Sequence, residues 1–233
     1  MIGDSTMHFN DINTYPQMGW GQVLNLFCKR DVYIHDLAEN GRSTKSFIKE
    51  GLFDKALSLL NKGDYVICQF GHNDEKVEDI TRGTNKDYDY LTNLKYFHDE
   101  VIKKGANIVF ATSITRRKFI NGICIDTHKG YPQAMLKFCK ENNYTCIDLN
   151  KLTLDLYNEL GEEETKKFHM IFKENQYENY PEGKEDNSHL MIDGAIMVSK
   201  LFVKALKKTD SKLNDFFIDL DEKIEIDERM LKD

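Results

Sequence analysis

The sequence predicts an α/β fold in which helices cover both faces of a mostly parallel sheet. Short apolar, β-branched runs alternate along the chain with longer segments of helical period, which is typical of repeated βα units. Glycine ends a helix and an apolar run follows at two places, Gly63-Asp64 and Gly105-Ala106. The 233 residues, 40% of them hydrophobic, suffice for one large core.

The expected elements follow from these runs. The strands are residues 1–3, 32–37, 65–70, 107–112 and 144–149. The helices are residues 19–29, 46–60, 90–104, 132–142, 151–167 and 192–207.

Two segments do not fit the alternation of strands and helices. Residues 114–130 and 168–188 are long polar inserts, and inserts of this length in α/β domains usually serve function. From residue 209 the chain becomes rich in Asp, Glu and Lys, which is typical of a solvated surface segment. We therefore expect a domain of residues 1–208 and an acidic C-terminal tail or peripheral extension of residues 209–233.

Charge and cysteine content limit the partners and the compartment. The net charge is −7 and the basic residues are scattered, so we expect no nucleic-acid partner, and an acidic substrate would need a local basic cluster. The five cysteines include no CxxC pair, which favours a reducing compartment. No leader or apolar run of about 18 residues is seen, so we expect a cytoplasmic protein without membrane contact. A start upstream of Met1 would weaken that localisation.

Polar blocks follow the expected strands at the positions where an open parallel sheet binds its ligands. They read GDST at residues 3–6, ENGRS at 39–43 and FGHND at 70–74, and DNSH at 186–189 forms a polar loop before the last helix. Each block alone is typical of turn or cap chemistry. Together they supply the groups that acyl transfer requires.

Within these blocks each residue type suits one step of ester hydrolysis. Ser5 can be the nucleophile, His189 its base, and Asp186 the carboxylate that holds the imidazole. The backbone N–H groups of Ser5 and Gly41 and the amide of Asn73 can form the oxyanion hole. Glycine leaves room in front of its N–H, and asparagine donates without a titrating charge.

Other polar residues have weaker assignments. Asp4 is expected to organise the turn by accepting backbone N–H bonds. Arg116 and Arg117 can bind a uronate carboxylate or lie in a solvated loop. His72 can contact substrate or ligate a metal, but hydrogen bonding within its turn is favoured because no paired ligand spacing accompanies it.

Trp20 can offer a platform for a sugar, although core packing is favoured because it lies between glycines at a helix start. The remaining histidines considered receive no role: His8, His98, His128 and His169.

The four blocks as a set resemble those of the SGNH (GDSL-type) hydrolase superfamily, and the finer similarity is to rhamnogalacturonan acetylesterases and related carbohydrate acetylesterases. It covers most of residues 1–206 and extends to Gly19-Trp20-Gly21, Arg42-Ser43, Asp64-Tyr65-Val66-Ile67, Gly130-Tyr131-Pro132 and Gly194. The resemblance implies a flavodoxin-like three-layer αβα sandwich with five parallel strands, the first in the middle. It implies Ser5, Gly41, Asn73 and His189 as signature residues, Asp186 as the third triad member, and neither metal nor cofactor.

By this resemblance the chain is a serine esterase that deacetylates acetylated rhamnogalacturonan (pectin) oligosaccharides through an acetyl-enzyme. Two alternatives remain: an SGNH esterase for acetyl-xylan or for small lipid or aryl esters, and a non-catalytic carbohydrate-binding homologue.

The expected first strand is unusually short, because only Met1, Ile2 and Gly3 precede Asp4. Backbone N–H and C=O groups of the neighbouring strands are then left unpaired. We expect either an upstream start or another segment that compensates.

Overall fold

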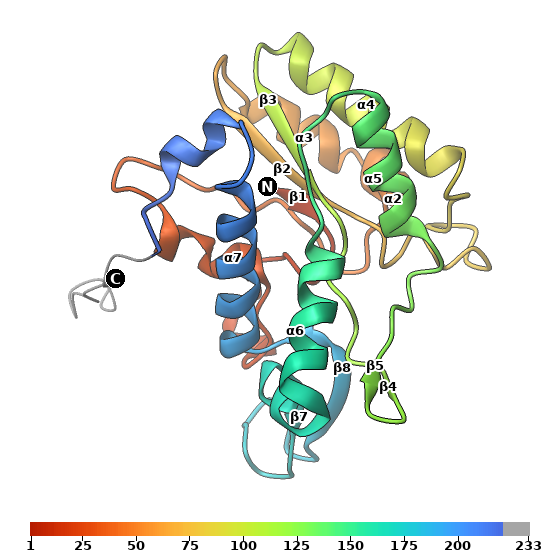
Figure 1. The fold of residues 1–233 in the computed structure, drawn as a ribbon, viewed down its shortest axis with the longest axis vertical. Coiled ribbons are helices and arrows are strands. Elements are labelled where there is room, and N and C mark those ends of the chain that lie inside the picture. The colour runs from red at the N-terminus through yellow and green to blue at the C-terminus, as the bar shows by residue number, and fades with distance from the viewer. Residues whose placement is uncertain (221–233) are drawn as a thin grey trace.

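The structure, a computed structural model, describes residues 1–220. Its central sheet is parallel and has the strand order β1-β2-β3-β6. The strands are β1 (Ile2–Gly3), β2 (Tyr65–Gln69), β3 (Asn107–Ala111) and β6 (Cys146–Ile147). Helices flank this sheet (Figure 1), so the predicted layered α/β architecture is confirmed.

The predicted number of strands is wrong, because the sheet has four strands instead of five. The expected strand at residues 32–37 runs beside β1 without forming a regular ladder. It is joined there by hydrogen bonds from the Met1 ammonium to the His35 carbonyl, from Leu37 N–H to Met1 and from Glu39 N–H to Gly3. Since β1 has only two residues, these bonds do not make a ladder, and β1 lies at the edge of the sheet, not in its middle.

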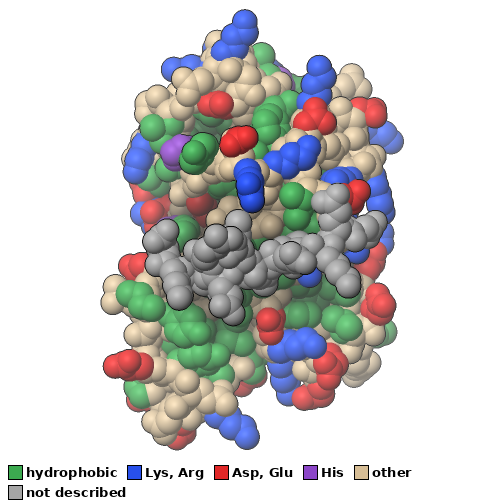
Figure 2. Space-filling view, turned by 90° about the vertical axis from the view of Figure 1, so that its left-hand side faces the viewer, with side chains coloured by type: hydrophobic (Ala, Val, Ile, Leu, Met, Phe, Trp, Pro, Cys, Tyr) green, Lys and Arg blue, Asp and Glu red, His purple; other side chains and the backbone are tan. Residues whose placement is uncertain are grey.

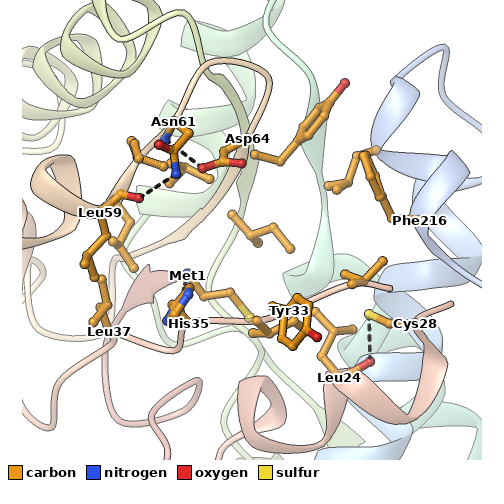
Figure 3. Close-up of a pocket in the computed structure, with 18 of the residues that line it drawn as sticks. Met1, Leu24, Cys28, Tyr33, His35, Leu37, Leu59, Asn61, Asp64 and Phe216 are labelled. Atoms are coloured by element: carbon orange, nitrogen blue, oxygen red, sulfur yellow. Dashed lines mark hydrogen bonds between the residues drawn. The ribbon is translucent and has the colours of Figure 1, made fainter. Parts of the chain in front are cut away.

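A cavity of about 380 Å³ lies at the amino end of the sheet, opposite the strand ends that carry the polar blocks. It is lined by residues 31–35 on one side and by the start of β2 on the other (Figure 3). Exposed Tyr33 and Phe216 also line it, and hydrophobic side chains reach the surface among charges of both signs on one side of the molecule (Figure 2). The start of β2 therefore borders this cavity instead of a further stretch of β1.

Four helices cover one face of the sheet: α2 (Thr44–Lys49), α3 (Leu52–Leu59), α4 (Asp89–Lys103) and α5 (Tyr131–Glu141). Their buried aromatic side chains, including Phe47, Phe53 and Phe97, pack against alternate residues of the strands. The single helix expected at residues 46–60 is divided because Gly51 takes a φ of 73°, which ends one helix and starts the next.

The other face is covered by α1 (Trp20–Val23), the 3₁₀ helix η2 (Leu24–Phe27), α6 (Leu149–Glu164) and α7 (Ile192–Leu206). Trp20 is fully buried and its ring lies 5.2 Å from that of Phe202, so the core assignment of this tryptophan is confirmed.

The chain beyond α7 returns to this face through the 3₁₀ helix η4 (Lys212–Phe216). Leu213 and Phe217 are buried in the same core cluster as α7. The prediction of a solvated segment is therefore wrong for these two residues, because their apolar side chains pack into the core beside α7. The division at residues 208 and 209 stays a prediction, and residues 221–233 lie outside the described part.

Both polar inserts form antiparallel strand pairs. The first contains β4 (Phe119–Ile120) and β5 (Ile123–Cys124), and the second contains β7 (His169–Phe172) and β8 (Lys184–Leu190). Two further 3₁₀ helices are η1 (Ile12–Thr14) and η3 (Thr165–Phe168). All five cysteines are free thiols, and within residues 1–220 no helix is long and apolar enough to cross a membrane.

Gly194 in the first turn of α7 is needed because the helix approaches the chain before β7 very closely. A Cβ at this position would overlap the Phe168 carbonyl oxygen, which already accepts the Met191 N–H, and would crowd Leu190. We expect Gly194→Ala to reduce the free energy of unfolding by roughly 1 to 3 kcal/mol, the usual effect of overpacking. Urea unfolding checks this, with exposed Lys200→Ala on the same helix as the control; equal stabilities would contradict the tight contact.

Candidate active site

A bulge in β8 presents the histidine of the DNSH block. Met170 pairs with Asp186 whereas the preceding His169 pairs with Leu190, so one step on β7 spans four steps on β8. The residues left unpaired in between are Asn187, Ser188 and His189. The sequence interpretation of this block as a loop is corrected: it is an irregular strand, and bulges of this kind re-aim side chains.

Ser5, His189 and Asp186 form one hydrogen-bonded chain. Ser5 Oγ lies 3.0 Å from His189 Nε2, and His189 Nδ1 lies 2.7 Å from Asp186 Oδ2. Ser5, which follows β1, and His189, on β8, are 184 positions apart in the sequence. The geometry has the order hydroxyl, imidazole, carboxylate that nucleophile activation requires.

Asp186 is held as a carboxylate. Burial alone would raise its pKa, but the His189 imidazole and the backbone N–H groups of Ser188 and His189 bond to it and bring the pKa well below its usual range. The other oxygen, Oδ1, accepts both backbone bonds, at 2.8 and 3.0 Å. The bulge therefore fixes which oxygen faces the imidazole.

The donors predicted for an oxyanion hole come from three separate segments: the turn after β1, the turn after residues 32–37 and the turn after β2. Within residues 1–220, the backbone N–H groups of Ser5 and Gly41 donate to no other group. Gly41 has a φ of 75°, and a Cβ there would meet only Arg82 Nη1, at 3.7 Å. Glycine is thus required at 41 for its left-handed backbone, a reason that adds to the space argument from the sequence.

The Asn73 side chain is held on both sides. Its Nδ2 donates to the Arg42 carbonyl at 3.0 Å, while its Oδ1 accepts from Lys76 Nζ at 2.9 Å and from Arg82 Nη1 at 3.4 Å. Since Lys76 and Arg82 can only donate, the atom that faces them must be the carbonyl oxygen. Among the residues that the structure describes, the second hydrogen of Nδ2 has no acceptor, so it can bond to a ligand.

Two buried aspartates support the strand ends around these donors. Asp4 Oδ1 accepts the Thr6 N–H and hydroxyl, which confirms the predicted turn-organising role. Asp74 accepts bonds from Thr44 at the start of α2 and from Thr84. Burial raises the pKa of Asp74 to about 7, although these hydrogen bonds lower it.

The arginines predicted to bind substrate are occupied by partners within the chain. Arg116 pairs with Glu75 at 2.6 Å and also donates to the His72 carbonyl and to Thr127.

Arg117 is buried, with 7% of its surface exposed. Its guanidinium donates to Asn187 in the bulge of β8, to the Thr165 hydroxyl and to the Glu162 carbonyl. These groups stabilise the surrounding loops, so the prediction of a substrate contact is not supported for either arginine.

His72 also serves an internal contact instead of a substrate contact. It is buried, and its Nδ1 lies 2.9 Å from His128 Nε2, whose Nδ1 lies 2.7 Å from Asp126. Burial, with the nearby charges of His128 and Arg116, lowers the pKa of His72 well below its usual value. His72 therefore makes an internal hydrogen bond, as the turn interpretation expected, and belongs to no group of three metal-ligating side chains in the described residues. Its partner, however, is His128 in the first insert and not a residue of its own turn.

His128 is a residue that sequence reasoning missed, having given it no role. Burial opposes ionisation of Asp126, but bonds from His128 and Asn150 lower its pKa to about 2. Because that carboxylate accepts, His128 carries its hydrogen on Nδ1 when neutral. The only local signal was the Asp-x-His spacing at 126–128. Within residues 1–220 no group of three metal-ligating side chains is found.

Comparison with curated proteins gives four sequence matches, two of them at 30% identity or more, while no family model matches the chain. The chain is 37% identical over 219 residues to a rhamnogalacturonan acetylesterase of Bacillus subtilis, covering 94% of this chain and 93% of that protein. It is 30% identical over 218 residues to a probable rhamnogalacturonan acetylesterase of the same organism, covering 94% and 96% of the two chains.

Solved structures show the same fold. A Bacillus subtilis protein superposes with a TM-score of 0.75 and 24% identity over 89% of this chain, which spans only 55% of that longer protein. An acetylxylan esterase of Geobacillus stearothermophilus superposes with a TM-score of 0.61 and 14% identity, covering 88% of this chain and 91% of that one.

Proposed function

The chain belongs to the SGNH (GDSL-type) hydrolase superfamily, in the group of rhamnogalacturonan acetylesterases, and on that premise we propose that it removes acetyl groups from carbohydrate as a serine esterase. The observation that carries the proposal is the chain of bonds from Ser5 through His189 to Asp186, at 3.0 and 2.7 Å. It is supported by the N–H groups of Ser5 and Gly41, which donate to no other group within residues 1–220.

In the first half of the reaction Ser5 Oγ attacks the acetyl carbonyl carbon while its proton passes to His189 Nε2. The negative charge that develops on the carbonyl oxygen is met by the N–H groups of Ser5 and Gly41 and by Asn73 Nδ2. The bond from the carbonyl carbon to the sugar oxygen then breaks, and His189 returns the proton to that oxygen. The product is a free sugar hydroxyl and an acetyl-serine.

In the second half a water molecule attacks the acetyl-serine carbonyl carbon. His189 Nε2 takes one proton from this water and gives it to Ser5 Oγ as the acyl bond breaks, which releases acetate. Asp186 keeps the imidazole oriented and stabilises its protonated form through the bond to Nδ1.

The proposed substrate is an acetylated rhamnogalacturonan oligosaccharide. Two observations support it: the extent of the similarity to proteins with that named activity, and a basic surrounding of the oxyanion donors in a chain of net charge −7. Lys76 and Arg82 both bond to Asn73; Arg82 is also paired with Asp79, whereas within residues 1–220 Lys76 has no carboxylate within 4.0 Å. Such a surrounding favours a sugar that carries carboxylates over a neutral one.

We expect acetate to be released faster from acetylated rhamnogalacturonan oligosaccharides than from acetyl-xylan, at least about tenfold in kcat/KM, which corresponds to about 1.4 kcal/mol of selective binding in the transition state. The measurement is enzymatic detection of acetate with both substrates and with p-nitrophenyl acetate. Equal rates on both polysaccharides, or hydrolysis of the aryl ester alone, would contradict this substrate but keep the esterase. Release from none of them would favour the non-catalytic binding protein.

A further inference from the structure

Lys76 has an unusual environment for a lysine at the surface. Its Nζ donates to Asn73 Oδ1 at 2.9 Å, and within residues 1–220 no carboxylate lies within 4.0 Å of it. Burial lowers its pKa and the charges of Arg82 and Arg116 lower it further, whereas the charges of Glu75 and Asp4 raise it. Lys76 and Arg82 thus share one amide carbonyl oxygen as acceptor, and this contact is unusual enough to ask what it does to Asn73.

The contact determines how the Asn73 amide is oriented. An amide that turned by 180° would place Nδ2 against Lys76 and Arg82, donor against donor, and would place Oδ1 against the Arg42 carbonyl. Both contacts would be repulsive. The cations and the carbonyl therefore select the same orientation, and it leaves one N–H of Nδ2 free.

A cation on the amide carbonyl also makes the opposite end a better donor. Hydrogen bonds to charged groups are stronger than neutral ones, and bonds in a chain polarise one another. Electron density drawn toward Oδ1 leaves the hydrogens of Nδ2 more positive. That effect is worth most when negative charge develops on the ligand, that is, in the transition state.

We propose that Lys76 is a positioning residue for the oxyanion hole, which fixes and polarises the Asn73 amide through its carbonyl oxygen. Arg82, at 3.4 Å from the same oxygen and paired with Asp79 at 2.7 Å, is the secondary contact. The proposal rests on the proposed esterase function, because it assigns Asn73 as a donor to the oxyanion.

A double-mutant cycle tests this role with the neutral ester p-nitrophenyl acetate, which has no carboxylate for Lys76 to attract. We expect Lys76→Met to lower kcat about tenfold with KM within about twofold, because the contact acts in the transition state. Asn73→Ala is expected to lower kcat about 10²- to 10³-fold, as for the loss of other oxyanion donors. In the Asn73→Ala background the further effect of Lys76→Met should fall below about twofold.

The control and the conservative variant sharpen the result. Lys49→Met removes the same charge from an exposed position on α2 and should leave kcat unchanged, whereas Lys76→Arg should recover most of the activity. A loss in Lys76→Met that persists in the Asn73→Ala background would overturn the proposal, as would a change in KM alone or unchanged kinetics. Lys76→Gln, which adds little apolar surface, replaces Lys76→Met if the latter melts at a lower temperature.

A second measurement does not depend on turnover and so separates this proposal from the proposed function. In a ¹H–¹⁵N spectrum, assigned with Asn73→Ala, the side-chain amide of Asn73 should shift in Lys76→Met and stay in place in Lys49→Met. An unmoved Asn73 resonance would overturn the positioning role even in an active enzyme. A moved resonance in a protein without esterase activity would keep the contact and contradict the proposed function.

Discussion

Ser5→Ala is expected to lower kcat for acetyl ester hydrolysis by about 10⁴- to 10⁶-fold, the range seen when a serine nucleophile is removed. The physical reason is that no other hydroxyl lies within hydrogen-bonding distance of His189 Nε2 in residues 1–220. The fold should survive, because the hydroxyl is half-buried and His189 Nε2 is the only partner its oxygen has in that part of the chain. Acetate release and thermal unfolding of the same preparation measure both effects.

The control for Ser5→Ala is Ser58→Ala, which removes an exposed hydroxyl on α3 that bonds only to the Lys55 carbonyl. A serine-directed fluorophosphonate probe should add one label per chain in the wild type and none in Ser5→Ala. Equal rates for Ser5→Ala and the wild type would rule out the mechanism. A wild type that is neither labelled nor active would instead indicate a carbohydrate-binding protein.

Asp186→Asn should cost about 10³- to 10⁴-fold in kcat while KM changes by no more than a few fold, since only the base is disturbed. Two backbone N–H groups bond to Oδ1, so the asparagine oxygen is expected to stay there and its amide nitrogen to face His189 Nδ1. Nδ1 must then accept, and the imidazole carries its proton on Nε2. In that tautomer His189 cannot take the Ser5 proton.

Steady-state kinetics on p-nitrophenyl acetate measures the effect of Asp186→Asn on the chemical steps. Glu185→Gln is the matched control, because it removes a carboxylate from the adjacent, exposed residue of β8. An unchanged kcat in Asp186→Asn would contradict the assignment of this carboxylate.

Ionisation of Asp186 also predicts the sign of its effect on stability. Its folded-state pKa lies well below the unfolded value, so the folded state binds fewer protons over the interval between the two. The stabilisation by the contacts of the Asp186 carboxylate is therefore complete above the unfolded pKa. It is lost as the pH falls through the folded pKa, and Asp186→Asn should flatten the acid limb of the unfolding free energy against pH.

Local sequence chemistry was enough for much of this protein. Period and glycine punctuation predicted the helices that flank the sheet, because burial of an apolar face imposes the same spacing wherever the helix packs. Asp186 and His189 are three residues apart, so their contact could be predicted from the spacing alone. The identities of Ser5, Gly41 and Asn73 followed from what acyl transfer demands of strand ends.

The errors concern contacts between distant segments. Whether residues 32–37 form a strand depends on how many ladder partners β1 offers, and whether Phe217 is buried depends on space beside α7. Whether Arg117 binds substrate or an internal partner depends on Asn187, which lies 70 positions away in the sequence and accepts a hydrogen bond from it. His72 and His128 meet across 56 positions, and no pattern in either segment records the other. Side-chain type and spacing state which bonds a residue can make, and only the packed chain determines which partner is within reach.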